Sequence, residues 1–259
     1  MKTPLFIIFL LSLSIDLTAS GQSAVRIETD LHQSFQKIGY WYEKKGDPGN
    51  AYDSLTKSND KFAYKLAAYT NKYPFTLRQN FPLLKNDRVD ISSSTDGMFR
   101  IYSWDTMEGG TMHIFENVFQ YNAGDKTTAI LDTPKEDGEY GPSYVKVYTF
   151  KASGKTYYLA TYLTIGSTRV AGQGIQVFDI ENGKLNDDVK LIKTKSGLHS
   201  QLSFGFDSFS EVDWKIRPEI YFNSDLKTIN LPLIDGDNKM THQYIVYKFD
   251  GQYFERVKN

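Results

Sequence analysis

Four residues near the middle of the chain have types and a spacing that could hold a sugar: Trp104, Asp105, Glu108 and His113. Asp105 directly follows an indole ring, and Asp105 and Glu108 both precede the Gly109-Gly110 turn. An aromatic ring beside a carboxylate can hold a sugar by stacking and by hydrogen bonds. The same pattern also builds turns, in which an Asp side chain bonds its own backbone. We treat the four residues as a candidate ligand-binding site, and we expect His113 to lie buried and hydrogen-bonded on a strand.

The residues that usually carry catalysis or bind metals are sparse in this sequence. There is no cysteine, and the four histidines lie far apart and are not paired with each other or with Glu at metal-binding spacing. No Gly-x-Ser-x-Gly elbow and no Gly-x-x-x-x-Gly-Lys phosphate loop is present. The sequence therefore predicts no catalytic residue, no metal and no cofactor.

The composition is that of a globular protein with almost balanced charge. The chain has 259 residues, with 30 Lys and Arg against 31 Asp and Glu, and 40% of its residues are hydrophobic. A formal net charge of -1 provides no basic field for nucleic acid or for an acidic membrane surface. We therefore expect a protein or a glycan as the partner, and no nucleic acid.

The first 21 residues have the order of a secretory signal. A positive charge at Lys2 is followed by the apolar run Leu5–Leu13 and by the small residues Ala19 and Gly21. The run is shorter than the about 20 residues that a membrane-spanning helix needs. We expect residues 1–21 to be a signal peptide and the product to be exported, without membrane insertion after cleavage, to the periplasm, the cell surface or the medium. The alternative is a buried N-terminal helix.

Residues 22–86 are predicted to form a helical hairpin and a linker. Apolar residues recur at helical spacing in two stretches that are separated by Gly46-Asp47-Pro48-Gly49. Asn50 is a possible cap of the second helix, Pro74 is its expected stop, and residues 73–85 are expected to be a linker. The two predicted stripes are Ile27, Leu31, Phe35, Ile38 and Tyr42, then Ala51, Leu55, Phe62, Leu66 and Tyr69.

Residues 87–259 are predicted to form an antiparallel β domain. Segments with alternating residues are joined by turn signals such as Asp96-Gly97, Asn182-Gly183 and Asp250-Gly251. The fold class is therefore α+β and mainly β: an αα-hairpin followed by an antiparallel meander, either a partial propeller-like sheet or a sandwich. The spacing on the strands leaves Tyr144, Tyr148 and Tyr158 as candidates for a solvent-facing group.

Two segments resemble uncharacterised secreted bacterial proteins that have a short helical N-terminal region and a β-propeller-like C-terminal part. Phe99–Gln120 is similar to a recurring segment of those proteins, and Tyr247–Gly251 is similar to the ends of many propeller-like secreted domains. Ile175–Leu185 also looks like the outer-strand hairpin of a propeller blade. The resemblance implies a fold and an exported location, and it implies no activity.

Three functions remain open from the sequence. The first is a non-catalytic, secreted or periplasmic binding protein, which fits a β-rich and aromatic-rich body without catalytic motifs. The second is a hydrolase of envelope glycan or peptide that uses a carboxylate pair, because such a pair leaves little trace in a sequence. The third is an inhibitor or immunity-like partner of a secreted enzyme, which would contact its target through the helical hairpin.

Overall fold

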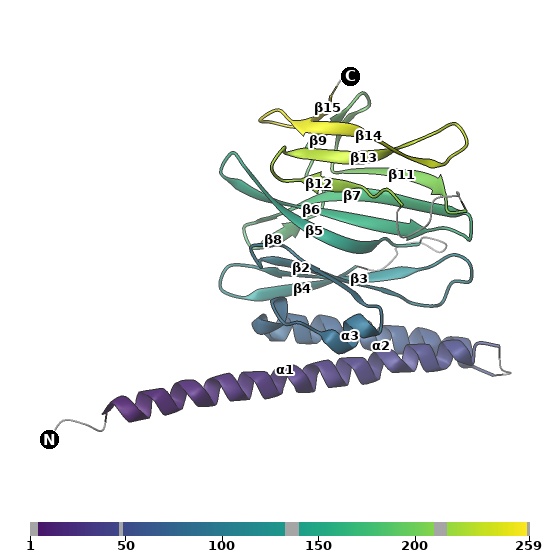
Figure 1. The fold of residues 1–259 in the computed structure, drawn as a ribbon. Helices are drawn as coiled ribbons and strands as arrows, with labels where there is room; N and C mark the ends of the chain where they lie inside the picture. Colours follow the sequence, from purple (N-terminus) through teal and green to yellow (C-terminus); the bar gives the residue numbers. More distant parts are fainter. Residues whose placement is uncertain (1–4, 47–48, 133–139, 210–216, 258–259) are drawn as a thin grey trace.

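The protein is built of helices packed on a stack of three open β-sheets (Figure 1). The computed structural model describes residues 5–46, 49–132, 140–209 and 217–257, with side chains from residue 23 onward. The described chain contains three α-helices, one short 3₁₀-helix and fifteen strands, and none of its sheets closes on itself. The predicted α+β, mainly β class is confirmed.

Helix α1 (Leu5–Glu43) is longer than the predicted helix, which began at Arg26. No proline interrupts the sequence between these bounds, and the first part is rich in Leu and Ile, which are compatible with a helix. The backbone is therefore helical through most of the predicted signal peptide. Export and cleavage stay predictions, and residues 1–4 lie outside the described part. No described helix combines the length and the apolar character that crossing a membrane requires.

Helix α2 (Ala51–Lys72) packs beside α1, as the hairpin prediction required. Leu31, Phe35 and Ile38 are buried, but Tyr42 is 48% exposed. Trp41 packs against the core instead, because a residue three positions after Ile38 lies on the same helix face.

The structure adds detail to two local predictions about the helical region. Asn50 occupies the predicted N-cap position of α2, but its side chain makes no capping bond, and the first turn is closed by the backbone bond from Ser54 N to Asn50 O. The expected linker contains two short helices, η1 (Pro74–Leu77) and α3 (Pro82–Asn86). Each begins with a proline, whose fixed φ suits the first helical position and whose missing N–H costs nothing there.

The first sheet contains β1 (Asp90–Ser93), β2 (Phe99–Asp105), β3 (Phe115–Asn122) and β4 (Thr127–Asp132), in that order. The β1–β2 turn uses Gly97 at a φ of 69°, as the Asp-Gly signal predicted.

The second sheet has the order β11-β7-β6-β5, and β8 pairs with β7. Its strands are β5 (Ser143–Ala152), β6 (Lys155–Ile165), β7 (Val170–Glu181), β8 (Lys184–Asn186) and β11 (Gln201–Asp207).

The third sheet has the order β10-β9-β15-β14-β13-β12, and its β15–β9 pair is parallel. Its strands are β9 (Ile192–Thr194), β10 (Gly197–His199), β12 (Tyr221–Asn223), β13 (Thr228–Ile234), β14 (Met240–Phe249) and β15 (Phe254–Arg256).

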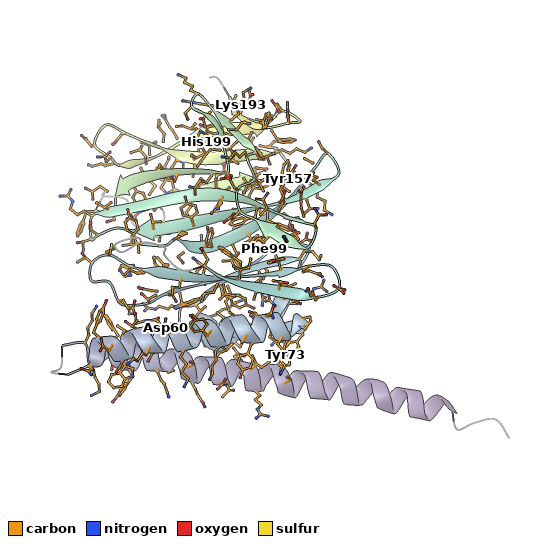
Figure 2. The ribbon with its side chains drawn as sticks, turned by 180° about the vertical axis from the view of Figure 1, so that it is seen from behind. Asp60, Tyr73, Phe99, Tyr157, Lys193 and His199 are labelled. Atoms are coloured by element: carbon orange, nitrogen blue, oxygen red, sulfur yellow. The ribbon has the colours of Figure 1, made fainter. Side chains whose placement is uncertain are left out.

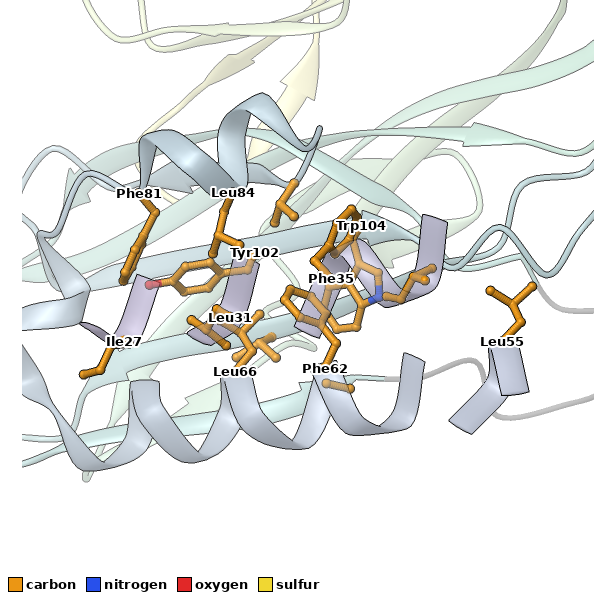
Figure 3. Packing of buried hydrophobic residues seen from close by; sticks show 14 residues of the cluster. Ile27, Leu31, Phe35, Leu55, Phe62, Leu66, Phe81, Leu84, Tyr102 and Trp104 are labelled. Atoms are coloured by element: carbon orange, nitrogen blue, oxygen red, sulfur yellow. The ribbon is translucent and has the colours of Figure 1, made fainter. Parts of the chain in front are cut away.

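A separate apolar cluster fills each interface of the stack. Trp104 and Tyr102 of β2 pack on the helices, together with Phe62 of α2 (Figure 3). The alternate residues of β2 face the second sheet, and Phe99, which is labelled in Figure 2, packs on Phe178 of β7. A third cluster joins the second and third sheets. The predicted helical and β parts thus share one core.

A buried polar network ties the helical part to the first sheet. Gln120 Nε2 donates to Thr70 O at 2.9 Å and to Thr76 Oγ1 at 2.7 Å. The Tyr102 hydroxyl donates to Gln120 Oε1 at 3.0 Å. Arg100 Nη1 donates to the carbonyl oxygens of Thr76 and Gln79, both at 2.6 Å. These bonds fix the end of α2 and η1 against β2 and β3.

We predict that Gln120→Met destabilises the protein by about 1–3 kcal/mol, because the substitution keeps the volume and leaves buried donors and acceptors unpaired. Urea denaturation measures the change in the free energy of unfolding. Gln252→Met, at an exposed position, is the control and should change stability by less than about 0.5 kcal/mol. Equal effects of the two substitutions would show that the network contributes no stability.

Candidate functional site

A cleft of about 720 Å³ opens where the second and third sheets meet. Strands β5, β6 and β7 line one side, and residues 217–221 with β14 line the other. The volume falls within the range of about 300–1,000 Å³ that small-molecule sites occupy. The side chains with recognition chemistry in its wall are Lys146, Tyr148, Arg217, Tyr221, His242 and Tyr244.

Two cations stand in the wall of the cleft. The Lys146 ammonium lies 4.8 Å from the centre of the Tyr148 ring. The Arg217 guanidinium lies 5.2 Å from the centre of the Phe206 ring, and its Nη2 donates to Ser208 O at 2.9 Å. Within the described part of the chain, neither cation forms an ion pair with a carboxylate.

Aromatic rings form the third-sheet side of the cleft. Tyr221 and Tyr244 meet edge to face, with ring centres 5.5 Å apart, and Tyr221 is 37% exposed. Burial, and then the neighbouring Tyr221 and Glu219, raise the pKa of Tyr244. The Tyr244 hydroxyl therefore stays protonated at neutral pH and can both donate and accept a hydrogen bond.

Gln173 fixes the two sides of the cleft to each other. Its Nε2 donates to Pro218 O at 3.3 Å, and its Oε1 accepts from Ile220 N at 2.9 Å. The side chain is buried on β7, so both ends of its amide are used by the segment that carries Arg217 and Tyr221. A buried and fully bonded amide of this kind limits the freedom of that segment.

A β-bulge decides which tyrosine of β5 reaches the cleft. The pairing of β5 with β6 shifts by one residue between Tyr144 and Lys146. Tyr144 therefore packs between the first and second sheets, whereas Tyr148 packs toward the third sheet. Tyr158 is also buried on the side of the first sheet. Of the three tyrosines considered as a solvent-facing group, only Tyr148 lines the cleft.

The four residues predicted as a ligand-binding site are only partly brought together. Trp104 is 1% exposed and packs edge to face on Phe62, with ring centres 5.1 Å apart, so its ring offers no face to a sugar. Asp105 points to the opposite side of β2 and bonds His113, with 2.5 Å between Oδ2 and Nδ1. His113 precedes β3 and its side chain is 41% exposed, so the expectation of a buried strand histidine was wrong.

Glu108 lies in a loop that is held by a lysine. Lys45 Nζ donates to the carbonyl oxygens of Glu108 at 2.8 Å and of Gly109 at 2.9 Å. A Cβ atom at Gly109 would stand 1.8 Å from Met112 O, so this position admits only glycine. The predicted Gly-Gly turn is thus a tightly packed loop that joins the helical hairpin to the first sheet.

Glu116 is an acidic residue that no motif in the sequence marks as functional. It lies on β3 directly opposite Trp104, and its Oε2 is buried without a hydrogen-bond partner in the described part of the chain. Burial, and then the negative charges of Glu108 and Asp60, raise the pKa of Glu116 to about 7. Strand alternation places Glu116 on the helix side of the sheet, but its neighbours come from α2 and from a separate loop, which local spacing does not reveal.

No cluster of metal ligands forms among the residues that the structure describes: no three His, Asp or Glu side chains gather closely enough to hold an ion. Among the described residues, the features that point to a ligand or to chemistry are the cations and rings of the cleft, the Asp105–His113 pair, and Glu116 with Glu108.

No protein-family model matches the chain, and neither a curated protein nor a solved structure matches it.

We predict that Glu116→Gln makes the protein more stable at about pH 8 by up to about 3 kcal/mol and has little effect near pH 4. The raised pKa means that the folded chain holds a proton that the unfolded chain loses near the ordinary value of 4.5. The native protein therefore loses stability as the pH rises from about 4.5 through 7, and the neutral amide avoids this loss.

Urea denaturation at the two pH values measures the effect. Glu219→Gln, at an exposed position, is the control and should show no such pH-dependent gain. A Glu116→Gln protein with the same pH profile as the native protein would contradict the assignment.

Proposed function

We propose that this chain is an exported, non-catalytic binding protein whose ligand occupies the cleft between the second and third sheets. The observation that carries the proposal is the lining of this cleft, where two cations lie beside tyrosine rings and have no carboxylate partner among the described residues. A few polar groups on a concave, partly aromatic surface are typical of ligand sites. The signal-like first 21 residues support the exported location.

The residues that line the cleft favour a binding site over the active site of a hydrolase that uses a pair of carboxylates. Glu219 is the single carboxylate among its described lining residues, so the described wall holds no pair of acids that could flank a bond. The nearly balanced net charge supports a protein or glycan partner over nucleic acid.

A second candidate function rests on Glu108 and Glu116. Burial, and then the negative charge of Glu108, raise the pKa of Glu116 to about 7, which would suit the general acid of a carboxylate-pair hydrolase of envelope glycan or peptide. Such an enzyme would cleave an envelope polymer and would lose turnover in Glu116→Gln while keeping its fold. Unchanged turnover in Glu116→Gln would exclude the pair.

We predict that Tyr148→Ala lowers the affinity of the chain for its cleft ligand by about tenfold or more, because the ring forms part of the wall and supports Lys146. Binding of the chain that begins at Gln22 to an array of bacterial envelope glycans measures the effect, followed by titration of the hits.

Tyr157→Ala is the matched control, since Tyr157 is a half-buried tyrosine of the same sheet and lies outside the cleft lining. An array without hits, or hits that Tyr148→Ala and Tyr157→Ala weaken equally, would overturn the cleft as the binding site.

A further inference from the structure

We infer that the cleft binds an acidic saccharide, in which sugar rings carry carboxylate groups. This inference rests on the proposed function and adds the chemical class of the ligand. Three features of the cleft lead to it: a positive balance of charge, a prepositioned guanidinium, and a pair of tyrosine rings beside both.

The charge of the described cleft wall is positive. Lys146 and Arg217 face a single acidic residue, Glu219, and His242 adds a further positive charge when it is protonated. Charges of one sign inside a concave surface concentrate the field and attract counter-ions. The chain as a whole carries a net charge of -1, so the positive cleft does not simply reflect the overall composition.

Arg217 is held in place before any ligand arrives. The contact with Phe206 and the bond to Ser208 O restrict its side chain, and Gln173 fixes the backbone that follows it. The Nε of Arg217 is buried and has no acceptor in the described part of the chain. The planar guanidinium matches the two oxygens of a carboxylate, so a ligand acid would supply a negative charge that the described residues do not provide.

Two cations elsewhere in the chain differ from those of the cleft because they have hydrogen-bond acceptors within the protein. Arg100 is buried and donates to two carbonyl oxygens, and Lys45 donates to the carbonyl oxygens of one loop. Both have structural acceptors that satisfy them. Lys146 is exposed and covers the face of an aromatic ring, with no described carboxylate or carbonyl as a partner. It is therefore available to an incoming acid.

The tyrosines favour a sugar as the carrier of the acid. Tyr221 and Tyr244 offer ring surface to the C–H groups of a pyranose, and their hydroxyl groups can bond sugar hydroxyls. Thr161 and Lys146 lie opposite each other on β6 and β5 and add short and long polar groups. An acidic peptide without aromatic side chains would satisfy the cations but would offer no ring to the tyrosines.

The test uses trimers of galacturonic acid and of mannuronic acid, each with its fully methyl-esterified form as the uncharged match. Calorimetric titration of the full chain should show that at least one acid trimer binds about tenfold more tightly than its ester. Raising the salt concentration should lower the affinity for the acid trimer and leave the affinity for the ester unchanged, because salt screens only the charged contacts.

Arg217→Gln should reduce the affinity for the acid trimer to that for the ester, without changing the affinity for the ester. Lys57→Gln, an exposed lysine on α2, is the charge-matched control and should change neither affinity. Circular dichroism and urea denaturation of each variant confirm that it is folded.

Equal affinities for the acid trimers and their esters would overturn the inference that the saccharide is acidic. The proposal that the cleft binds a glycan would stand. Binding of a tri-glutamate peptide that Arg217→Gln abolishes, without binding of either uronate trimer, would overturn the saccharide as the ligand class and leave the binding function intact. An absence of binding to all of these probes would also overturn the inference, and the Tyr148→Ala array experiment separately decides the proposed function.

Discussion

The whole architecture depends on a first sheet that is buried on both faces. Six successive residues of β2, from Phe99 to Trp104, are buried, alternately against the second sheet and against the helices. An antiparallel sheet usually leaves one face to water, and covering both faces requires a partner layer on each side. The helical hairpin is that partner on one side, and the Gln120 network fixes it there. The helices are therefore part of the core, and the body continues from them as a stack of sheets.

Two interfaces of this stack provide different environments for charged groups. At the helix–sheet end, Lys45 and Arg100 have carbonyl acceptors, and Glu116 is kept partly protonated by burial and by neighbouring acids. Between the second and third sheets, Lys146 and Arg217 have no described carboxylate partner. Buried charges need partners within the protein, whereas a ligand can supply the opposite charge to a cation at a cleft. This contrast distinguishes cations that have acceptors within the protein from cations that line the cleft.

The cleft is built mainly from side chains that the fold holds in fixed positions. Its wall is assembled from rigid strands, and the segment before β12 is attached to β7 through the side chain of Gln173. Side chains on helices and strands are positioned more precisely than side chains on loops. Preorganised groups of this kind reduce the ordering that a ligand must impose on binding.

The sequence by itself determined the helical periodicity of the hairpin, the alternation of the strands and the glycine turns at Gly97, Gly183 and Gly251, because each is a property of neighbouring residues. It did not determine that Trp104 points into the core or that the bulge after Tyr144 turns Tyr148 toward the cleft. Nor did it show that Lys146, Gln173, Arg217 and Tyr244 meet. Strand register, bulges and the stacking of sheets join residues far apart in the chain, and a one-residue shift reverses the face of every side chain beyond it. Those choices are made by packing between layers, which only the tertiary structure contains.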